Sequence, residues 1–384
     1  MLKLILAALG LAIAGPALAQ LPATVTHPSA LVDSTPATPG IIVNKAVTTP
    51  RLPVGTVIYP CGSMAAPFVY GVGSAENCPR PAPASSPVDP WAIAPPRMVT
   101  PCVAGGGNLA ATGRSGVCMD RAMEAYPFHA AAGYDNVVIH DVRLGLVRAM
   151  VYNKWQSAWS KIPVEQRPAD IGAIRGLTVE RVEATCIKYC ITIDRVGGNY
   201  TFRDLRLRGG PPLTSTGDIP VGIQIGGTAS NILVERVHSS GFTTAYPPGH
   251  YAQGDSFSNE RGVSNVTYRY TIGEDSTDGC YDLKSTNTLL DNTRAIRCNY
   301  GYRLWGTGRG TTIECVDNRL ACIWVGKNAN YTIDTLIVTG SPKLVSVGDR
   351  SARLVVRRCI WRGPRAAVLV HGDADVALGE GCRP

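Results

Sequence analysis

Acidic and basic side chains gather most densely between residues 274 and 285 of this 384-residue chain. The stretch contains Glu274, Asp275, Asp278, Asp282 and Lys284, with four acids inside nine residues. Ca²⁺ favours sites with several oxygen ligands, so acids at this density around a turn predict a calcium site. A lysine beside them could act as the base in a proton abstraction if its pKa were lowered.

The segment before this stretch adds further polar residues. Asp255 is a fourth candidate metal ligand. The predicted calcium ligands are therefore Asp255, Asp275, Asp278 and Asp282. Tyr251, Glu260 and Arg261 belong to the longest insertion between the repeats described below. Because inserted loops on a rigid scaffold tend to carry binding residues, we predict that these three residues bind substrate.

The elements that must position these residues are short and repeat along the chain. From about residue 171 onward, an Asn is followed three residues later by a large apolar residue. The pairs are Asn199/Phe202, Asn231/Val234, Asn265/Tyr268, Asn287/Leu290 and Asn330/Ile333, with Gly310/Ile313 and Ser351/Leu354 as relatives. From Tyr268 onward the apolar positions lie 22, 23, 20 and 21 residues apart, and the two earlier gaps of 32 and 34 indicate loop insertions.

A second series of apolar residues has the same period. Short alternating strands end at Leu283, Leu304, Val325, Val347 and Val370, which lie 21, 21, 22 and 23 residues apart. One repeat cannot bury its apolar residues alone, so the repeats must stack into a solenoid whose equal positions form columns. Asn tolerates left-handed backbone geometry, which explains an Asn at the same turn of each coil. A β-propeller is disfavoured because its blades need roughly twice this period.

These features resemble the right-handed parallel β-helix of the pectate-lyase-like superfold. The Asn turn positions, the period and the stacked aliphatic columns carry the resemblance over residues 171–378. It implies an all-β fold, a right-handed parallel β-helix with coils of about 20 to 25 residues and loop insertions. It also implies a carbohydrate-active protein, although this fold hosts lyases, hydrolases, epimerases and non-catalytic adhesins.

Side chains alternate across a strand, so the neighbours of the inward residues must point outward. The predicted outward column is Asp282, Arg303, Trp324, Ser346 and Leu369, beside a second column of Lys284 and Trp305. Aromatic rings stack on sugars, and Arg or Lys meets acidic groups. This face therefore predicts a binding surface for an acidic polysaccharide, with Trp305 and Trp324 as further substrate-binding residues.

The D-x-x-x-D-L-K sequence that ends at Lys284 is similar to the acidic calcium cluster of one pectate-lyase type. That resemblance implies Asp ligands for Ca²⁺ and Lys284 as the base. No adjacent Asp pair, no G-H-G with R-x-K, and no R-x-P-x-x-R sequence is present.

The leading hypothesis is β-elimination on a uronate-containing polysaccharide, with Lys284, Arg303 and Asp282 as catalytic residues. A cation would neutralise the uronate carboxylate, and Arg303 would lower the pKa of Lys284. Two other functions stay open. One is a glycoside hydrolase with two carboxylates such as Asp255 and Asp278. The other is a non-catalytic glycan-binding or cell-surface β-helix, in which the charged residues form a structural ion ladder.

The first 101 residues differ from the repeats. Residues 1–19 predict a signal peptide cleaved after Ala19, because Lys3 and an apolar run precede an A-x-A site. We therefore expect a secreted or periplasmic protein with no integral membrane segment after cleavage. Seventeen of the 28 Pro lie within residues 1–101, which predicts an extended Pro-rich arm over 20–101. Residues 102–170 are expected to form the N-terminal cap and first coils, and residues 171–384 the β-helix with its C-terminal cap.

Composition limits the partners. The 29 Arg and 8 Lys outnumber the 29 acidic residues and give a net charge of +8. The sequence has no Lys/Arg block of the kind that is typical of nucleic-acid binding. We expect no nucleic-acid partner and a monomer that binds an acidic polysaccharide. All 12 Cys lie beyond residue 60, and an even number in an exported chain favours disulfides. Cys61 with Cys78 and Cys102 with Cys118 are plausible local pairs, and the remaining pairing stays open.

Overall fold

In the computed structural model, the described residues are 89–95, 134–153 and 173–383, together with four short strands between residues 57 and 129. The predicted signal peptide and most of the predicted arm lie outside these residues. The proposed pairs of Cys61 with Cys78 and of Cys102 with Cys118 also lie outside the described side chains. Within the described part of the chain, no helix has the length and apolar character needed to span a bilayer.

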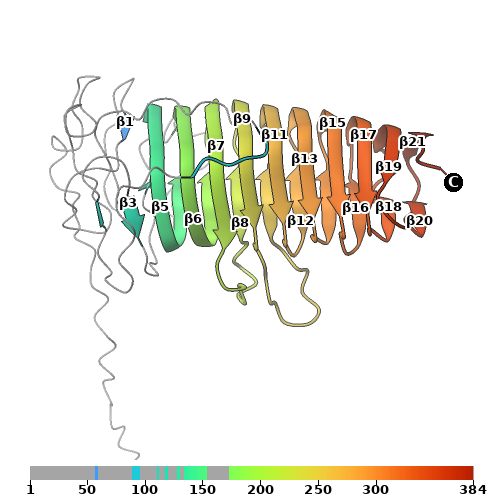
Figure 1. Cartoon of the computed structure of the whole chain (residues 1–384), viewed down its shortest axis with the longest axis horizontal. Coiled ribbons are helices and arrows are strands. Elements are labelled where there is room, and N and C mark those ends of the chain that lie inside the picture. The colour runs from blue at the N-terminus through green and yellow to red at the C-terminus, as the bar shows by residue number, and fades with distance from the viewer. Residues whose placement is uncertain are drawn as a thin grey trace, which may run out of the picture.

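The chain folds as the predicted right-handed parallel β-helix (Figure 1). The short N-terminal strands are β1 (Val57–Ile58), β2 (Ala110–Ala111), β3 (Val117–Met119) and β4 (Phe128–His129). The first full coils are β5 (Tyr134–Asn153) and β6 (Ile174–Ile193). Among the described strands, every pairing is parallel except that of β2 with β3.

Each later coil holds one long and one short strand. The long strands are β7 (Gly197–Gly209), β9 (Ala229–Ser240), β11 (Ser264–Glu274), β13 (Thr286–Ile296), β15 (Thr307–Val316), β17 (Asn330–Thr339), β19 (Arg353–Trp361) and β21 (Asp375–Glu380). The short strands are β8 (Val221–Ile225), β10 (Asp255–Asn259), β12 (Gly279–Leu283), β14 (Tyr300–Leu304), β16 (Ala321–Val325), β18 (Lys343–Val347) and β20 (Val368–His371). The short strands form one continuous face, because each pairs with the short strand of the next coil.

Left-handed backbone residues turn each coil at its corners. One column stands at the start of the long strands and consists of Asn199, Asn231, Asn265 and Asn287, with φ between 54° and 57°. A second column bends the long strands at mid-length and consists of Arg181, Asp204, Arg236, Tyr270 and Asn292. A third precedes the short strands and includes Asp275, Arg297, Asp317 and Gly340. Where all three corners occur, they divide the coil into three faces.

The predicted Asn positions form a hydrogen-bonded ladder over four coils. Each side-chain amide donates to the amide oxygen of the preceding coil: Asn231 to Asn199 at 3.3 Å, Asn265 to Asn231 at 3.2 Å and Asn287 to Asn265 at 2.7 Å. These bonds explain the choice of Asn over Gly at a left-handed corner, because Asn satisfies the backbone geometry and also links the coils.

Replacing Asn265 by Ala is expected to lower the free energy of unfolding by about 1–2 kcal/mol, because Ala has no side chain to offset the left-handed backbone at this corner. Asn265→Gly should lose less, since Gly adopts a positive φ without strain. Urea denaturation of the two variants checks this ranking. A larger loss for Gly than for Ala would mean that the amide contacts, and not the backbone angle, dominate at this corner.

The repeat assignment was correct for Ile333, which continues the column of Leu290, but it was wrong for the two relatives that lack Asn. Gly310 pairs with Leu290 and Ile333, so it occupies the apolar position and does not replace an Asn. Leu354 pairs with Tyr331, whereas the apolar series predicted that it pairs with Ile333. The physical reason is turn length: a coil that gains or loses a residue at one corner shifts every later position, while the apolar spacing hardly changes.

Aromatic rings stack along the inside of the short-strand face. The ring centroids of Phe257 and Tyr281 are 4.9 Å apart, and those of Tyr281 and Tyr302 are 4.8 Å apart with nearly parallel planes. The aliphatic column beside them pairs Leu283 with Leu304 as expected, and it continues through Val325 to Val347. The prediction that Val370 follows Val347 was wrong, because Val370 pairs with Val345.

Four disulfides lie within the described solenoid. They join Cys186 to Cys190, Cys280 to Cys298, Cys315 to Cys322 and Cys359 to Cys382. The Cys280–Cys298 and Cys359–Cys382 pairs connect successive coils, whereas the Cys315–Cys322 pair closes a corner between β15 and β16. Disulfides of this number fit an oxidising compartment, which agrees with the expected export.

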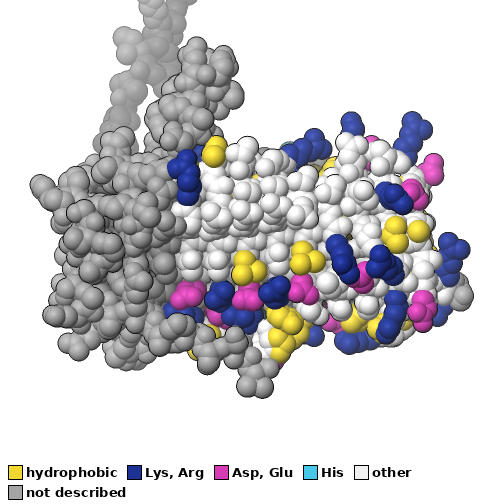
Figure 2. All heavy atoms as spheres, turned by 90° about the horizontal axis from the view of Figure 1, so that it is seen from above, with side chains coloured by type: hydrophobic (Ala, Val, Ile, Leu, Met, Phe, Trp, Pro, Cys, Tyr) yellow, Lys and Arg dark blue, Asp and Glu magenta, His cyan; other side chains and the backbone are white. Residues whose placement is uncertain are grey.

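Many of the arginines belong to ladders of alternating charge. The strand register places Glu180, Arg203, Glu235, Arg269 and Asp291 in one column on successive coils. Nitrogen–oxygen distances along it are 2.9 Å for Arg203–Glu235 and 2.9 Å for Arg269–Asp291. Acidic and basic side chains also mix on the face seen in Figure 2. Part of the Arg excess is therefore structural.

A short segment far earlier in the sequence lies across the long strands. Residues 89–95 run over β7, β9 and β11 (Figure 1). The Trp91 ring meets Tyr270 edge-on with centroids 5.5 Å apart, and the Arg294 guanidinium lies 4.2 Å from the Trp91 ring centre. The backbone N–H of Ala94 donates to Asp204 at 3.3 Å. This part of the predicted arm is therefore held on the solenoid.

Candidate functional site

Most of the predicted site residues meet on the outer surface of the short-strand face. Asp255 begins β10, Asp278 directly precedes β12, and Asp282 lies within β12. Arg303 lies in β14, and Trp324 lies in β16. We call this surface the acidic face. It consists of Tyr251, Asp255, Glu260, Asp278, Asp282, Lys284, Arg303, Trp305 and Trp324.

The outward column was predicted correctly over four coils. The register pairs Asp282 with Arg303, Arg303 with Trp324, and Trp324 with Ser346. The next member was wrong, because Ser346 pairs with His371 and not with Leu369. The error follows from the two-residue shift at β20 already described for Val370.

Three carboxylates share the centre of the acidic face, and all are almost fully buried. Asp255 is 5% exposed, Asp278 1% and Asp282 5%. Asp255 accepts a hydrogen bond from the backbone N–H of Gly279 at 2.9 Å. A Cβ at Gly279 would stand 3.0 Å from that carboxylate oxygen and 3.2 Å from Cδ of Arg303. Glycine at this position therefore lets the backbone approach the cluster closely.

Arg303 bridges two of the carboxylates. Its Nη1 lies 2.5 Å from Oδ2 of Asp278 and 3.7 Å from Oδ1 of Asp282. The guanidinium is itself largely buried and lies 5.5 Å from the centre of the Trp324 ring. Because the cation is enclosed by carboxylates, the pKa of Arg303 is raised and its charge is fixed.

Burial raises the pKa values of two of the three carboxyl groups, those of Asp255 and Asp278. Burial and the neighbouring carboxylates Asp278 and Asp282 raise the pKa of Asp255 well above its ordinary value. Burial also raises the pKa of Asp278 to about 6, against the opposing charge of Arg303. A carboxyl group with this pKa is a proton donor near neutral pH.

Lys284 is held by two acids. Its Nζ donates to Asp282 at 2.7 Å and to Glu260 at 3.2 Å. Burial favours the neutral amine, but the carboxylates of Asp282 and Glu260 outweigh it, so the pKa of Lys284 is raised. The prediction that Arg303 lowers the pKa of Lys284 was wrong, because the nearby carboxylates raise this pKa more than burial lowers it. Lys284 balances the charge of Asp282 in this arrangement.

Two tryptophans extend the acidic face toward the C-terminal coils. The Trp305 indole N–H donates to Oδ1 of Asp282 at 2.7 Å, and the Trp305 and Trp324 rings are 4.3 Å apart. Gly326 and Gly348 make room for them, since a Cβ at either position would overlap an indole ring. The rings thus lie along the strand backbone beside the carboxylates.

An inserted loop reaches the carboxylate of Asp278. Residues 241–254 connect β9 to β10, and a parallel bridge between Leu213 and Thr244 joins this loop to the connection before β8. The Tyr251 hydroxyl donates to Oδ1 of Asp278 at 2.7 Å, although the Tyr251 side chain is 56% exposed. Tyr251 therefore closes Asp278 from solvent while its own ring faces outward.

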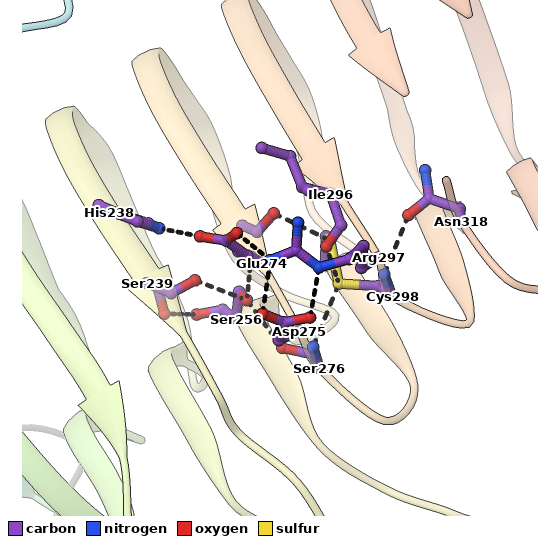
Figure 3. A network of polar contacts seen from close by, with 12 residues as sticks. His238, Ser239, Ser256, Glu274, Asp275, Ser276, Ile296, Arg297, Cys298 and Asn318 are labelled. Carbon is purple, nitrogen blue, oxygen red and sulfur yellow. Dashed lines mark hydrogen bonds and ion pairs between the residues drawn. A yellow bond between two sulfur atoms is a disulfide. The ribbon is translucent and has the colours of Figure 1, made fainter. Parts of the chain in front are cut away.

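Two predicted residues stand apart from the cluster. Asp275 occupies the corner before β12 with φ of 54°, and it binds Arg297 through distances of 2.9 and 2.8 Å (Figure 3). Arg261 is exposed and has no hydrogen-bond or ion-pair partner among the described residues. Within the described part of the chain, no three His, Cys, Asp or Glu side chains are placed to hold a metal ion. The calcium site stays a prediction.

The structure adds one residue that the sequence analysis missed. Tyr300 pairs with Gly279, and its ring centroid lies 6.4 Å from that of Trp324. The missed signal was the register itself: Asp255, Gly279 and Tyr300 occupy equal positions on successive coils.

Comparison of the chain with protein-family models, with curated proteins and with solved structures gives no match.

Proposed function

We propose that this chain is a carbohydrate-active enzyme that hydrolyses glycosidic bonds of a polysaccharide on the acidic face. One observation carries the proposal: a buried carboxyl group with a pKa of about 6, Asp278, stands beside a second carboxylate whose charge is balanced by bonded cations. Glycoside hydrolysis needs such a pair, one group to protonate the leaving oxygen and one to activate water or attack the sugar.

The contacts divide the roles. Asp278 is the general acid, since its raised pKa keeps a proton available. Asp282 is the second carboxylate: Lys284 binds one of its oxygens and the Trp305 indole binds the other. Asp255, whose pKa burial raises well above its ordinary value, accepts the Gly279 hydrogen bond and positions the cluster. Tyr251 must leave Asp278 before a glycosidic oxygen can accept the proton, so the inserted loop controls access.

The substrate is proposed to be a polysaccharide with acidic groups. Sugar rings would stack on Trp305 and Trp324. Arg261, which is exposed, follows Glu260 in the sequence and is free of partners among the described residues, would meet a carboxylate of the polymer.

β-Elimination is the rival reaction. It requires a free base near the uronate, and the candidates Lys284 and Arg303 both have raised pKa values because carboxylates bind them. A panel of acidic and neutral polysaccharides separates the functions. New reducing ends without ultraviolet-absorbing products support hydrolysis, and unsaturated products would replace it by elimination. Binding without any turnover would favour the non-catalytic alternative.

The pH dependence of hydrolysis follows from Asp278. The value of kcat/KM is expected to fall about tenfold per pH unit above pH 6, because the general acid ionises there. Rates measured from about pH 5 to about pH 8 on one polysaccharide check this. A rate that keeps rising above neutral pH would show that a base with a higher pKa limits the reaction.

A further inference from the structure

A second polar hollow lies around the corner from the acidic face, on the outer surface of β7, β9 and β11. Its volume is about 220 Å³. Its lining consists of Arg206, Leu207, Arg208, His238, Ser240 and Glu274. The strand register sets Arg206 opposite His238, and it sets Arg208 opposite Ser240, which faces Glu274 on the next coil. Three successive coils therefore build the hollow.

The one acid in this lining is already bound on both oxygens. Oε2 of Glu274 lies 2.6 Å from Nε2 of His238, and Arg297 binds the other oxygen (Figure 3). Arg297 is in turn held by both oxygens of Asp275. This chain of contacts fixes His238 in the wall and leaves Glu274 little capacity to bind a further cation.

The two arginines of the hollow have fewer and longer contacts with acids than the arginines of the charge ladders. Arg208 is exposed and has no hydrogen-bond or ion-pair partner among the described residues. Arg206 has only long contacts, 3.9 Å to Glu183 and 3.5 Å to the Ile93 carbonyl. The ladder arginines elsewhere on the solenoid, such as Arg203 and Arg269, approach carboxylates to 2.9 Å. Unlike those residues, Arg206 and Arg208 retain donors for a ligand.

We propose that this hollow binds an oxyanion group, a carboxylate or a sulfate, carried by a sugar-sized molecule. Arg206 and Arg208 are two residues apart on one strand, so their side chains leave the same side of β7. Two guanidinium groups on one side match the several oxygens of a carboxylate or sulfate. His238 and the Ser240 hydroxyl line the same hollow and add polar contacts. The site uses none of the residues of the acidic face and does not depend on the proposed hydrolysis.

Isothermal titration calorimetry at constant ionic strength tests the site with sodium glucuronate, sodium sulfate and neutral glucose. We expect saturable binding of at least one of the two anions and none of glucose. The double variant Arg206→Gln/Arg208→Gln should weaken anion binding at least tenfold. The matched control is Arg358→Gln, which changes an exposed arginine of β19 that also lacks a partner among the described residues and should leave binding unchanged.

The two anions identify the source of the oxyanion. Tighter binding of glucuronate assigns the site to a carboxylate on a sugar, and tighter binding of sulfate assigns it to a sulfate group. The proposal is overturned if neither anion binds saturably, or if the double variant binds as tightly as the control. Circular dichroism shows whether the double variant keeps its β structure. Because the readout is binding, failure here leaves the hydrolysis proposal untouched.

Discussion

Asp278→Asn is expected to lower the kcat of polysaccharide hydrolysis by about 10²- to 10⁴-fold, the range that a general acid contributes. The amide keeps the shape of the side chain and its one oxygen can accept the Arg303 bond, while the Tyr251 hydroxyl can turn to accept from the amide nitrogen. The amide has no acidic proton to give to the leaving oxygen. The initial rate of reducing-end release, measured at about pH 5 and at saturating polysaccharide, gives the result directly.

The control for this variant is Asp291→Asn, which changes a carboxylate of the charge ladder on another face. It should keep at least half of the activity, roughly, since a partly exposed ion pair contributes at most about 1 kcal/mol to stability. Asp278→Asn that folds normally and turns over at the rate of this control would remove Asp278 from the mechanism.

Tyr281→Ala is expected to lower the free energy of unfolding by about 3–5 kcal/mol, the cost of removing a buried aromatic ring from a packed core. Tyr281 is fully buried and stacks between Phe257 and Tyr302. Its hydroxyl also bonds the Thr271 side chain at 2.9 Å. The ring lies next to Asp282 in β12, so its loss should loosen the strand that carries the acidic face.

Tyr281→Phe separates the ring from the hydroxyl. It keeps the stack and removes only the hydrogen bonds, so about 1–3 kcal/mol should be lost. Guanidinium denaturation followed by far-ultraviolet circular dichroism measures both variants. If Tyr281→Ala costs no more than Tyr281→Phe, the aromatic stack does not hold the coils together and the hydrogen bonds alone account for the effect.

The corners of the fold could be predicted from the sequence, and the register only in part. Asn199, Asn231, Asn265 and Asn287 signal their corner because few other residues combine a left-handed backbone with a side chain that bonds its own copy in the next coil. Gly310 shows the limit. The period places it at an Asn corner, whereas its strand pairs place it in the apolar column. Spacing alone does not tell at which corner a coil has gained or lost a residue.

The candidate site, too, could be predicted from the sequence only in part. Alternation along a strand was enough to place Asp282, Arg303 and Trp324 on one outward column, because their coils have equal lengths. Proximity in the sequence misplaced Asp275. The left-handed corner at that residue turns the chain, so Asp275 faces Arg297 while Asp278, three residues later, joins the acidic face. The pKa of Lys284 depends on Glu260 of the preceding coil, a contact that no local pattern indicates.

Polysaccharide cleavage in water labelled with heavy oxygen tests the central claim most directly. Hydrolysis on the acidic face predicts one labelled oxygen at every newly formed reducing end, read by mass spectrometry of the released oligosaccharides, and loss of these products in Asp278→Asn. Unsaturated chain ends without label would contradict the account, because they would show that the bond breaks by elimination and that water is not a reactant.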